Sequence, residues 1–416
     1  MIKLKRNVGN WVEGKDFWDR EIELKNLTEL LQEDANVLIT APRRIGKTSL
    51  IRETARRLQN KNICILIDLQ KCDSPVDAIT ELSIATKPYK PLWNNTKETF
   101  ENILKTVKGN VDTLGIDKLT IKLRDSISSD WKSKGNQILD IMSNSIKPVI
   151  IFLDEFPLLI NRLLKGSNFK ITPERLSLTE DFLSWIRSTT IQYNKKLRLV
   201  ITGSIGLEPI LRQAGLSSTM NTFSSFEISS WDRKTTAGCL QALAHYYNLR
   251  FENSAKDKMI DLIGCCIPHH VQMFFSYVYD DCKRRNNLKC RPEDAERIYN
   301  AFMLSTRGHA ELSTYEERLK VVLGENTLPL ALELLTEAAV TGKLTTLAAN
   351  ILLNDFLPEK KYTQDTLREI LSILEHDGYL MKKESDYVFI SKLVSDWWKR
   401  RFEFLFTPAS KREKSK

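Results

Sequence analysis

A short loop near the start of the chain has the residues needed to bind phosphate. The apolar run 37–40 is followed by a small residue, four variable residues and Gly46-Lys47-Thr48, where a helical pattern begins. Backbone N–H groups around a glycine at the positive end of a helix can converge on an anion. We expect Lys47 to reach the β- and γ-phosphates and the Thr48 hydroxyl to bind Mg²⁺. The loop therefore predicts a site for a nucleoside triphosphate.

The predicted nucleotide-binding residues are those of this loop and the first helical turn. They are Pro42, Arg43, Arg44, Ile45, Gly46, Lys47, Thr48 and Ser49. Ala41 stands where such loops usually have their first glycine, and it is nearly as small. Arg43 and Arg44 would either touch phosphate or a partner, or carry solvated positive charge, and the sequence leaves these alternatives open.

A second segment supplies carboxylates. The apolar run 149–153 ends in Asp154 and Glu155, which is typical of a parallel strand buried on both faces with its acids at the carboxyl edge. Ligands of open α/β sheets bind at that edge. We expect Asp154 to hold Mg²⁺ together with Thr48, and Glu155 to orient or deprotonate the attacking water. Lys47, Asp154 and Glu155 are therefore predicted catalytic residues.

A third buried strand, predicted over 197–204, has a polar tip. If it lies between the strand before the phosphate loop and the carboxylate strand, Thr202 or Ser204 lies near the γ-phosphate. Ser204 completes the predicted catalytic set.

The elements that must position these residues alternate up to about residue 230. Helices are predicted over 47–59 and 176–193 and a further strand over 63–69, which indicates a parallel sheet wrapped on both faces. Residues from about 88 to 135 are polar and lysine-rich and are interpreted as an insertion. This first domain is predicted to span 1–230.

Beyond residue 230 the pattern is helical. Helices over 231–247, 255–263, 271–285, 295–303 and 311–323 predict a helical lid domain spanning 231–325. Helices over 329–340, 344–353 and 363–376, followed by a short hairpin, predict a winged helix-turn-helix domain spanning 326–405. Residues 406–416 form a basic tail.

Composition narrows the class of protein. The 416 residues are 42% hydrophobic, and no apolar run approaches the about 20 residues of a membrane span. The first residues lack the apolar core of a signal peptide, so we expect a cytoplasmic protein. The seven cysteines have no disulfide pattern and are expected to be reduced, and the spacing around Cys265, Cys266, His269 and His270 does not match a zinc site.

These motifs together resemble the archaeal-type ATPases and their bacterial relatives, a STAND and AAA+-like branch of the P-loop proteins. The resemblance is carried by the N-terminal box Phe17-Trp18-Asp19-Arg20-Glu21, the Arg-Arg phosphate loop, the Asp154-Glu155 strand end, the 201–204 strand tip and Gly264-Cys-Cys-Ile-Pro268 in the lid. It implies an α/β P-loop domain of the ASCE or AAA+-like type with bound ATP and Mg²⁺. It also implies a completing arginine from the lid or a neighbouring subunit, although His269 and His270 follow the lid motif here.

The charge distribution bears on DNA binding. The third helix of the predicted winged domain carries Arg368 against Asp365, Glu369, Glu375 and Asp377, a net charge of −3, which would repel a phosphate backbone. Residues 379–416 contain ten Lys and Arg against five Asp and Glu, a net charge of +5 of the chain's +9. This wing and tail could contact DNA non-specifically or simply be solvated.

Two functions remain open at the level of sequence. The first is a Mg²⁺-dependent ATPase, possibly slow in turnover, that works as a switch acting on DNA or a partner protein. The second is a nucleotide-dependent, oligomerising interaction module that recruits an effector protein with little hydrolysis. Glu155 favours the first, because a protein that only binds nucleotide does not need a second carboxylate beside Asp154.

Overall fold

The computed structural model describes residues 4–99, 116–128, 130–359 and 363–412. The chain divides into two compact units. The first contains residues 20–40 and 47–227 and is called the sheet unit here. The second contains residues 1–19, 41–46 and 228–416 and is called the C-terminal unit. The loop 41–46 therefore belongs to a different unit from the strand and helix that it connects.

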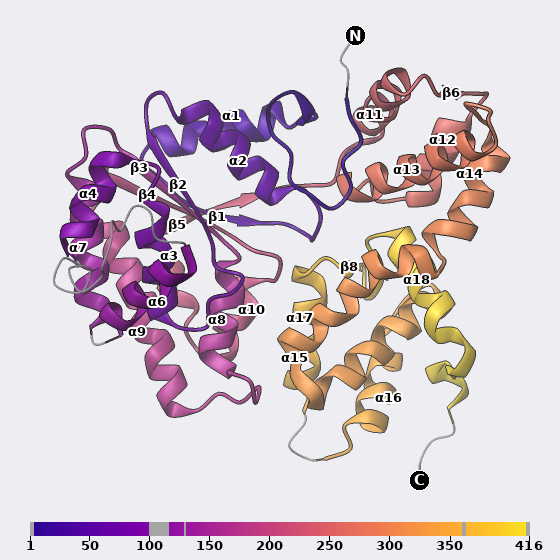
Figure 1. Cartoon of the computed structure of the whole chain (residues 1–416). Helices are drawn as coiled ribbons and strands as arrows, with labels where there is room; N and C mark the ends of the chain where they lie inside the picture. Colours follow the sequence, from indigo (N-terminus) through magenta and orange to yellow (C-terminus); the bar gives the residue numbers. More distant parts are fainter. Residues whose placement is uncertain (1–3, 100–115, 129, 360–362, 413–416) are drawn as a thin grey trace. The chain divides into compact units, whose positions relative to one another are not determined.

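The sheet unit is built on five parallel strands in the order β2-β3-β4-β1-β5 (Figure 1). Their bounds are β1 (Asn36–Thr40), β2 (Ile63–Asp68), β3 (Val149–Asp154), β4 (Leu197–Thr202) and β5 (Phe223–Glu227). All of β4 and the first five residues of β3 are buried, because these apolar runs are covered on both faces. The predicted parallel sheet is confirmed, and β4 lies between β1 and β3.

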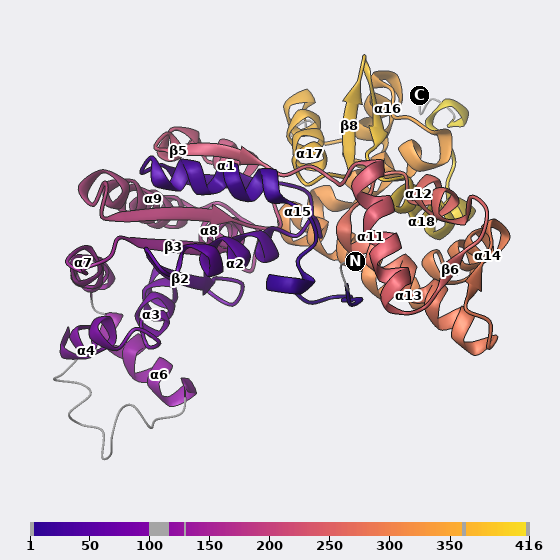
Figure 2. The ribbon, with the colours of Figure 1, turned by 90° about the horizontal axis from the view of Figure 1, so that it is seen from above.

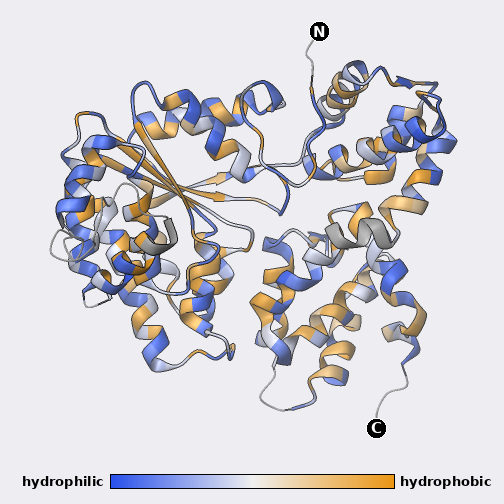
Figure 3. Ribbon diagram, viewed as in Figure 1, coloured by the Kyte–Doolittle hydropathy of each residue, from blue (hydrophilic) through white to orange (hydrophobic). Residues whose placement is uncertain are grey.

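Helices cover both faces of this sheet. They are α1 (Glu21–Gln32), α2 (Lys47–Leu58), α3 (Pro75–Ala85), α4 (Lys90–Thr99), α6 (Ile116–Ile127), α7 (Trp131–Ser143), α8 (Phe156–Lys165), α9 (Pro173–Gln192) and α10 (Leu207–Gln213). Figure 1 shows α1 and α2 on one face and α8, α9 and α10 on the other, and Figure 2 gives a second view. The hydrophobic strands stand out between the mixed helices in Figure 3.

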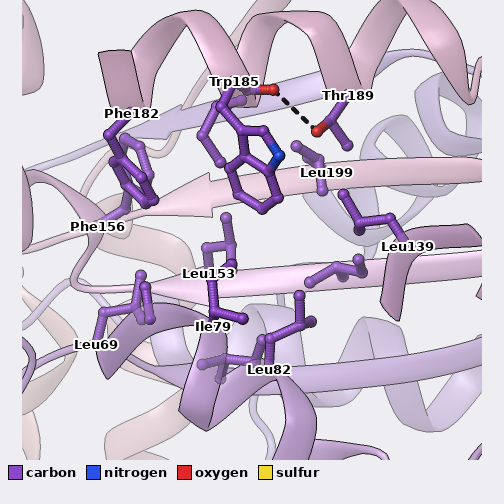
Figure 4. A pocket seen from close by; sticks show the side chains of 14 residues that line it. Leu69, Ile79, Leu82, Leu139, Leu153, Phe156, Phe182, Trp185, Thr189 and Leu199 are labelled. Carbon is purple, nitrogen blue, oxygen red and sulfur yellow. Dashed lines mark hydrogen bonds between the residues drawn. The ribbon is translucent and has the colours of Figure 1, made fainter. Parts of the chain in front are cut away.

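A small apolar cavity of about 30 Å³ lies in the core between this sheet and its helices (Figure 4). Its walls come from β2, β3 and β4 and from α3, α7, α8 and α9. The polar atom of Thr189 donates a 2.9 Å hydrogen bond to the Trp185 carbonyl, so the lining offers little to a water molecule. The cavity is a packing gap and does not suit a polar ligand.

The C-terminal unit is mainly helical. Its helices are α11 (Arg233–Tyr246), α12 (Ala255–Ile263), α13 (Pro268–Arg284), α14 (Pro292–Ile298), α15 (Thr306–Thr341), α16 (Thr346–Phe356), α17 (Gln364–His376) and α18 (Lys392–Phe402). Two short sheets accompany them, a parallel pair of β6 (Arg250–Phe251) and β7 (Lys289–Cys290) and an antiparallel pair of β8 (Leu380–Lys383) and β9 (Asp386–Phe389). One apolar core runs from Leu4 to Ala409.

Several element boundaries differ from the sequence predictions. The two helices predicted over 311–323 and 329–340 form one helical run, α15, which is interrupted at Gly324, where φ is 73°. Strand β5 and helix α18 were not predicted; β5 is a polar edge strand with little apolar pattern. The predicted insertion contains α4, α6 and the start of α7, and its residues 100–115 lie outside the described ranges.

Two further observations concern side chains and hydropathy. Trp397 and Trp398 are buried in the core of the C-terminal unit. All seven cysteines are free thiols. In the described part of the chain, no helix combines the length and the apolar character needed to span a membrane.

Candidate nucleotide-binding site

The carboxyl edge of the parallel sheet gathers the predicted catalytic side chains. Strands β1, β4, β3 and β2 end there side by side, and α2 and α8 begin directly beyond β1 and β3. Since β4 separates β1 from β3, the tip of β4 comes between the start of α2 and the start of α8. The polar tips of three strands and two helix N-termini thus face the same region of the sheet unit.

Thr48 and Asp154 are in direct contact. The Thr48 hydroxyl donates a 2.7 Å hydrogen bond to Asp154 Oδ2, and the Glu155 backbone N–H donates to Asp154 Oδ1 at 3.0 Å. The side chain before this pair, Lys47, is only 7% exposed at the N-terminus of α2. The two predicted metal ligands therefore present hard oxygen atoms within reach of a single small cation.

Glu155 is held by the tip of β4. Ser204 donates to Glu155 Oε2 from its hydroxyl at 2.8 Å and from its backbone N–H at 3.1 Å. Glu155 itself has a left-handed backbone, with φ of 58°, at the turn from β3 into α8. The two Ser204 donors fix the Glu155 carboxylate.

Thr202, the other polar residue predicted at this tip, is fully buried. Its hydroxyl has no hydrogen-bond partner within the described parts of the chain. Of the two residues, Ser204 is therefore the one that reaches the carboxylates.

A third carboxylate, Asp68, was not singled out from the sequence. It ends β2 in register with Asp154 at the end of β3, and its Oδ1 accepts a 2.8 Å hydrogen bond from the Gln70 N–H. The signal was present, because the run 63–67 is apolar and ends in an acid in the same way as the run 149–153. Asp68 adds negative charge to the edge where Asp154 and Glu155 lie.

The electrostatics of the edge favour a bound cation. Burial raises the pKa of Asp154, the hydrogen bond from Thr48 opposes this rise, and the nearby Glu155 and Asp68 carboxylates add to it. The two neighbouring carboxylates therefore disfavour the ionised form of Asp154. A divalent cation beside Asp154 would neutralise that repulsion and favour the ionised form.

The loop residues 42–46 lie in the C-terminal unit, and two of them make contacts that the sequence did not predict. Arg43 donates a 2.5 Å hydrogen bond to the Thr314 carbonyl of α15, and Arg44 lies 2.7 Å from His269 Nε2 of α13. Ile45 is buried, and Gly46 has φ of 100° with open space where a Cβ would be. Gly46 thus keeps the bare, left-handed backbone that an anion-binding loop needs.

Comparison with known protein families finds a match that covers most of the sheet unit and the loop 41–46. Residues 17–214 match the family described as an ATPase domain predominantly from Archaea. This segment is similar to the P-loop ATPase domains of that family. The N-terminal box, the phosphate loop, the Asp154-Glu155 strand end and Ser204 all fall within the matched residues.

Solved structures share the fold of this chain. The Walker-type ATPase PABY2304 of Pyrococcus abyssi has 16% sequence identity and a TM-score of 0.61, over 94% of this chain and 99% of that chain. The ORC2 protein of Aeropyrum pernix, solved as ADPNP and ADP complexes, has 11% identity and a TM-score of 0.52, over 92% of each chain. At such identities the likeness concerns the fold alone. No curated protein matches the sequence.

The residues at this sheet edge fit a magnesium-bound nucleotide. Thr48 and Asp154 offer oxygen ligands that are already 2.7 Å apart. The N-terminus of the 12-residue helix α2 follows the open Gly46 turn and directs N–H groups toward an anion. Lys47 adds a positive charge at the same place.

Proposed function

We propose that this protein is a Mg²⁺-dependent ATPase that acts as a nucleotide-controlled switch of the AAA+ or STAND type. The observation that carries the proposal is the chain of hydrogen bonds from Thr48 to Asp154 and from Ser204 to Glu155 at one sheet edge. Asp154 contacts the hydroxyl of Thr48, the other predicted metal ligand, and Glu155 is held by a different residue. Two carboxylates with separate partners are suited to hydrolysis, because one can hold the metal ion and the other can act on the water.

Each residue has a role in this proposal. Lys47 and the N–H groups at the start of α2 bind the phosphates, and Thr48 with Asp154 holds Mg²⁺. The metal ion, when bound, neutralises charge that develops on the phosphate oxygens. Glu155 orients the attacking water and accepts its proton, and Ser204 keeps the Glu155 carboxylate in place.

The C-terminal elements are proposed to transmit the nucleotide state. Helices α11 to α14 would form the lid, and α15 to α17 with the β8–β9 pair would form a winged helix. Within α17, the exposed charges are Arg368 against Asp365, Glu369 and Glu375, and Arg368 is paired with Asp365 at 2.7 Å. This acidic helix supports a protein partner or a second copy of the chain, with DNA touched only non-specifically through basic residues of the wing and tail.

The alternative is an oligomerising module that binds ATP, recruits an effector and hydrolyses little. It is favoured by the two Ser204 hydrogen bonds if they hold the Glu155 carboxylate away from the attacking water. Turnover of the wild-type protein distinguishes the two functions.

The test compares binding and hydrolysis in two variants. We expect Lys47→Ala to abolish binding of a non-hydrolysable ATP analogue, because the loop loses its charged phosphate ligand. We expect Glu155→Gln to bind the analogue as the wild type does while turnover falls at least about a hundredfold, the usual contribution of a general base. Calorimetry and a phosphate-release assay, with and without double-stranded DNA, measure these quantities.

The outcomes separate the candidates. Unchanged turnover in Glu155→Gln removes that residue from the mechanism. Negligible turnover in the wild type, combined with analogue-dependent growth in the mass of the complex, favours the oligomerising module. Tight analogue binding by Lys47→Ala contradicts the assigned site.

A further inference from the structure

The last described segment of the chain folds back onto two helices of the C-terminal unit. Residues 406–412, called the docked segment here, follow α18 and lie beside α16 (Figures 1 and 2). The Arg412 guanidinium donates to Glu333 of α15 at 2.7 Å and to Asp355 of α16 at 3.3 Å. It also lies 5.3 Å from the centroid of the Phe356 ring. Two carboxylates and an aromatic ring from two helices thus hold one arginine.

The backbone of the docked segment is bound as well. The Ala409 N–H donates a 2.9 Å hydrogen bond to Glu337 Oε2, and the exposed fractions of these residues are only 2% and 4%. Glu337 lies four residues after Glu333 on α15, so the two carboxylates share one face of the helix. A buried carboxylate is costly unless a hydrogen-bond donor meets it. The docked segment therefore supplies donors to three carboxylates of α15 and α16.

The spacing along the docked segment defines what these helices recognise. Phe406 lies under the arginine, with its ring centroid 5.5 Å from the guanidinium of Arg412. The Arg412 Nε also donates to the Thr407 carbonyl at 2.9 Å, which closes the segment on itself. Ala409, at the centre, has room only for a small side chain, because it is almost fully buried. The recognised pattern is an aromatic residue, a small residue and an arginine at intervals of three.

The docked segment is attached by few contacts. Ala409 is its one buried residue, and the two ion pairs of Arg412 remain partly open to water. Phe404 and Leu405, which connect α18 to the segment, are 92% and 90% exposed. Because ion pairs in contact with water contribute little to stability, such a segment can be displaced by another with the same pattern.

We propose that the surface formed by Glu333, Glu337, Asp355 and Phe356, called the arginine site here, is a docking site for a partner protein. The partner supplies a short segment with the pattern of residues 406–412. The chain's own docked segment occupies the arginine site and masks it until the partner displaces it. Three carboxylates in one place favour a cationic peptide and disfavour nucleic acid. The inference is independent of the proposed function, because it requires no nucleotide.

The first measurement uses a fluorescent peptide with the sequence of residues 403–412 as the probe. We expect full-length Arg412→Ala to bind this peptide at least about tenfold more tightly than the wild type does. The variant's own segment has lost its ion pairs, so the arginine site is open in a larger fraction of molecules. Lys411→Ala removes an exposed neighbouring charge and is the matched control, which should bind as weakly as the wild type. Fluorescence anisotropy without nucleotide gives the affinities.

The second measurement changes the peptide and leaves the protein as it is. On full-length Arg412→Ala, a peptide copy with the same Arg412→Ala substitution should bind about tenfold more weakly than the native peptide, because it cannot reach the two carboxylates. A peptide copy with Arg412→Lys should recover only part of the affinity, because an ammonium group cannot present the planar fork of donors that a guanidinium has. These comparisons do not depend on how a protein variant folds.

Four results overturn the inference. Absence of peptide binding by Arg412→Ala means that the arginine site does not dock a free segment. Equal binding by the wild type and Arg412→Ala means that the chain's own segment does not mask the site. Equal binding of the native and Arg412→Ala peptides means that the arginine is not recognised. A concentration-dependent dimer of the wild type that Arg412→Ala abolishes would assign the site to exchange of segments between two copies of the chain.

Discussion

Ser204 contributes to the site differently from what the sequence predicted. It was expected near the γ-phosphate, and its two hydrogen bonds are to the Glu155 carboxylate. The backbone N–H donates one of them, and alanine at this position would keep that hydrogen bond. Only the hydrogen bond from the hydroxyl would be lost in Ser204→Ala. Ser204 is therefore argued to act through Glu155.

A substitution at Ser204 tests that role. We expect Ser204→Ala to lower turnover about fivefold while binding of the ATP analogue stays within about twofold, since one hydrogen bond of about 1 kcal/mol to the base is lost and the other remains. Ser204→Thr keeps a hydroxyl and should restore most of the turnover. A loss of analogue affinity as large as the loss of turnover would assign Ser204 to the phosphates instead.

Residue-level prediction from sequence was good where a motif is contiguous and poor where a contact joins distant segments. Thr48, Asp154 and Glu155 could be named because each stands at the end of a patterned run. His269 could not be assigned to Arg44, because 225 residues separate them and no pattern links them. Asp68 could have been found from its strand pattern alone.

At the scale of elements, the close approach of the β4 tip to α8 brings Ser204 to Glu155. A Cβ at Gly203 would lie 2.5 Å from Pro157 Cδ and 2.8 Å from Cγ, and the proline ring cannot move aside. Pro157 is the second residue of α8, where a proline is well tolerated. The absence of a side chain at Gly203 thus sets the spacing between strand and helix.

Gly203→Ala should therefore impair hydrolysis through geometry. We expect the added methyl group to push the tip of β4 away from α8 and to lengthen the Ser204–Glu155 hydrogen bonds. Turnover should then fall at least about tenfold, and the free energy of unfolding should fall by about 1–3 kcal/mol. Steady-state kinetics and urea unfolding measure the two effects. The double variant Gly203→Ala with Pro157→Ala removes the ring and should recover turnover; failure to recover it would show that the methyl group acts elsewhere.

The order of elements could be read from the sequence more surely than their packing. Long apolar runs ending in polar residues gave β1 to β4, because such runs need burial on both faces. The polar β5 gave no such signal and depends on pairing with β1. The membership of loop 41–46 in the C-terminal unit has no local signal at all, since it arises from contacts with α13 and α15.

For the whole molecule, the net charge of +9 is distributed unevenly. Part of the positive charge of the C-terminal segment is neutralised within the unit, as Arg401 pairs with Glu316 at 2.9 Å and Arg412 pairs with Glu333 at 2.7 Å. The exposed lysines of β8, Lys382 and Lys383, are not on the acidic helix α17. An electrostatic contact of DNA with the β8–β9 pair would therefore involve Lys382 and Lys383 and not α17.

Salt dependence tests this assignment. We expect weak association with double-stranded DNA of arbitrary sequence, falling steeply between 50 and 200 mM salt, because phosphate contacts release counterions. Lys382→Ala combined with Lys383→Ala should reduce the slope of log affinity against log salt by about 2, close to one unit for each phosphate contact. Fluorescence anisotropy at several salt concentrations gives the slope.

Arg368→Ala is the control, because its charge is already paired with Asp365 on a helix that repels phosphate. Sequence-specific binding that disappears in Arg368→Ala would place α17 on the DNA and would reverse the preference for a protein partner.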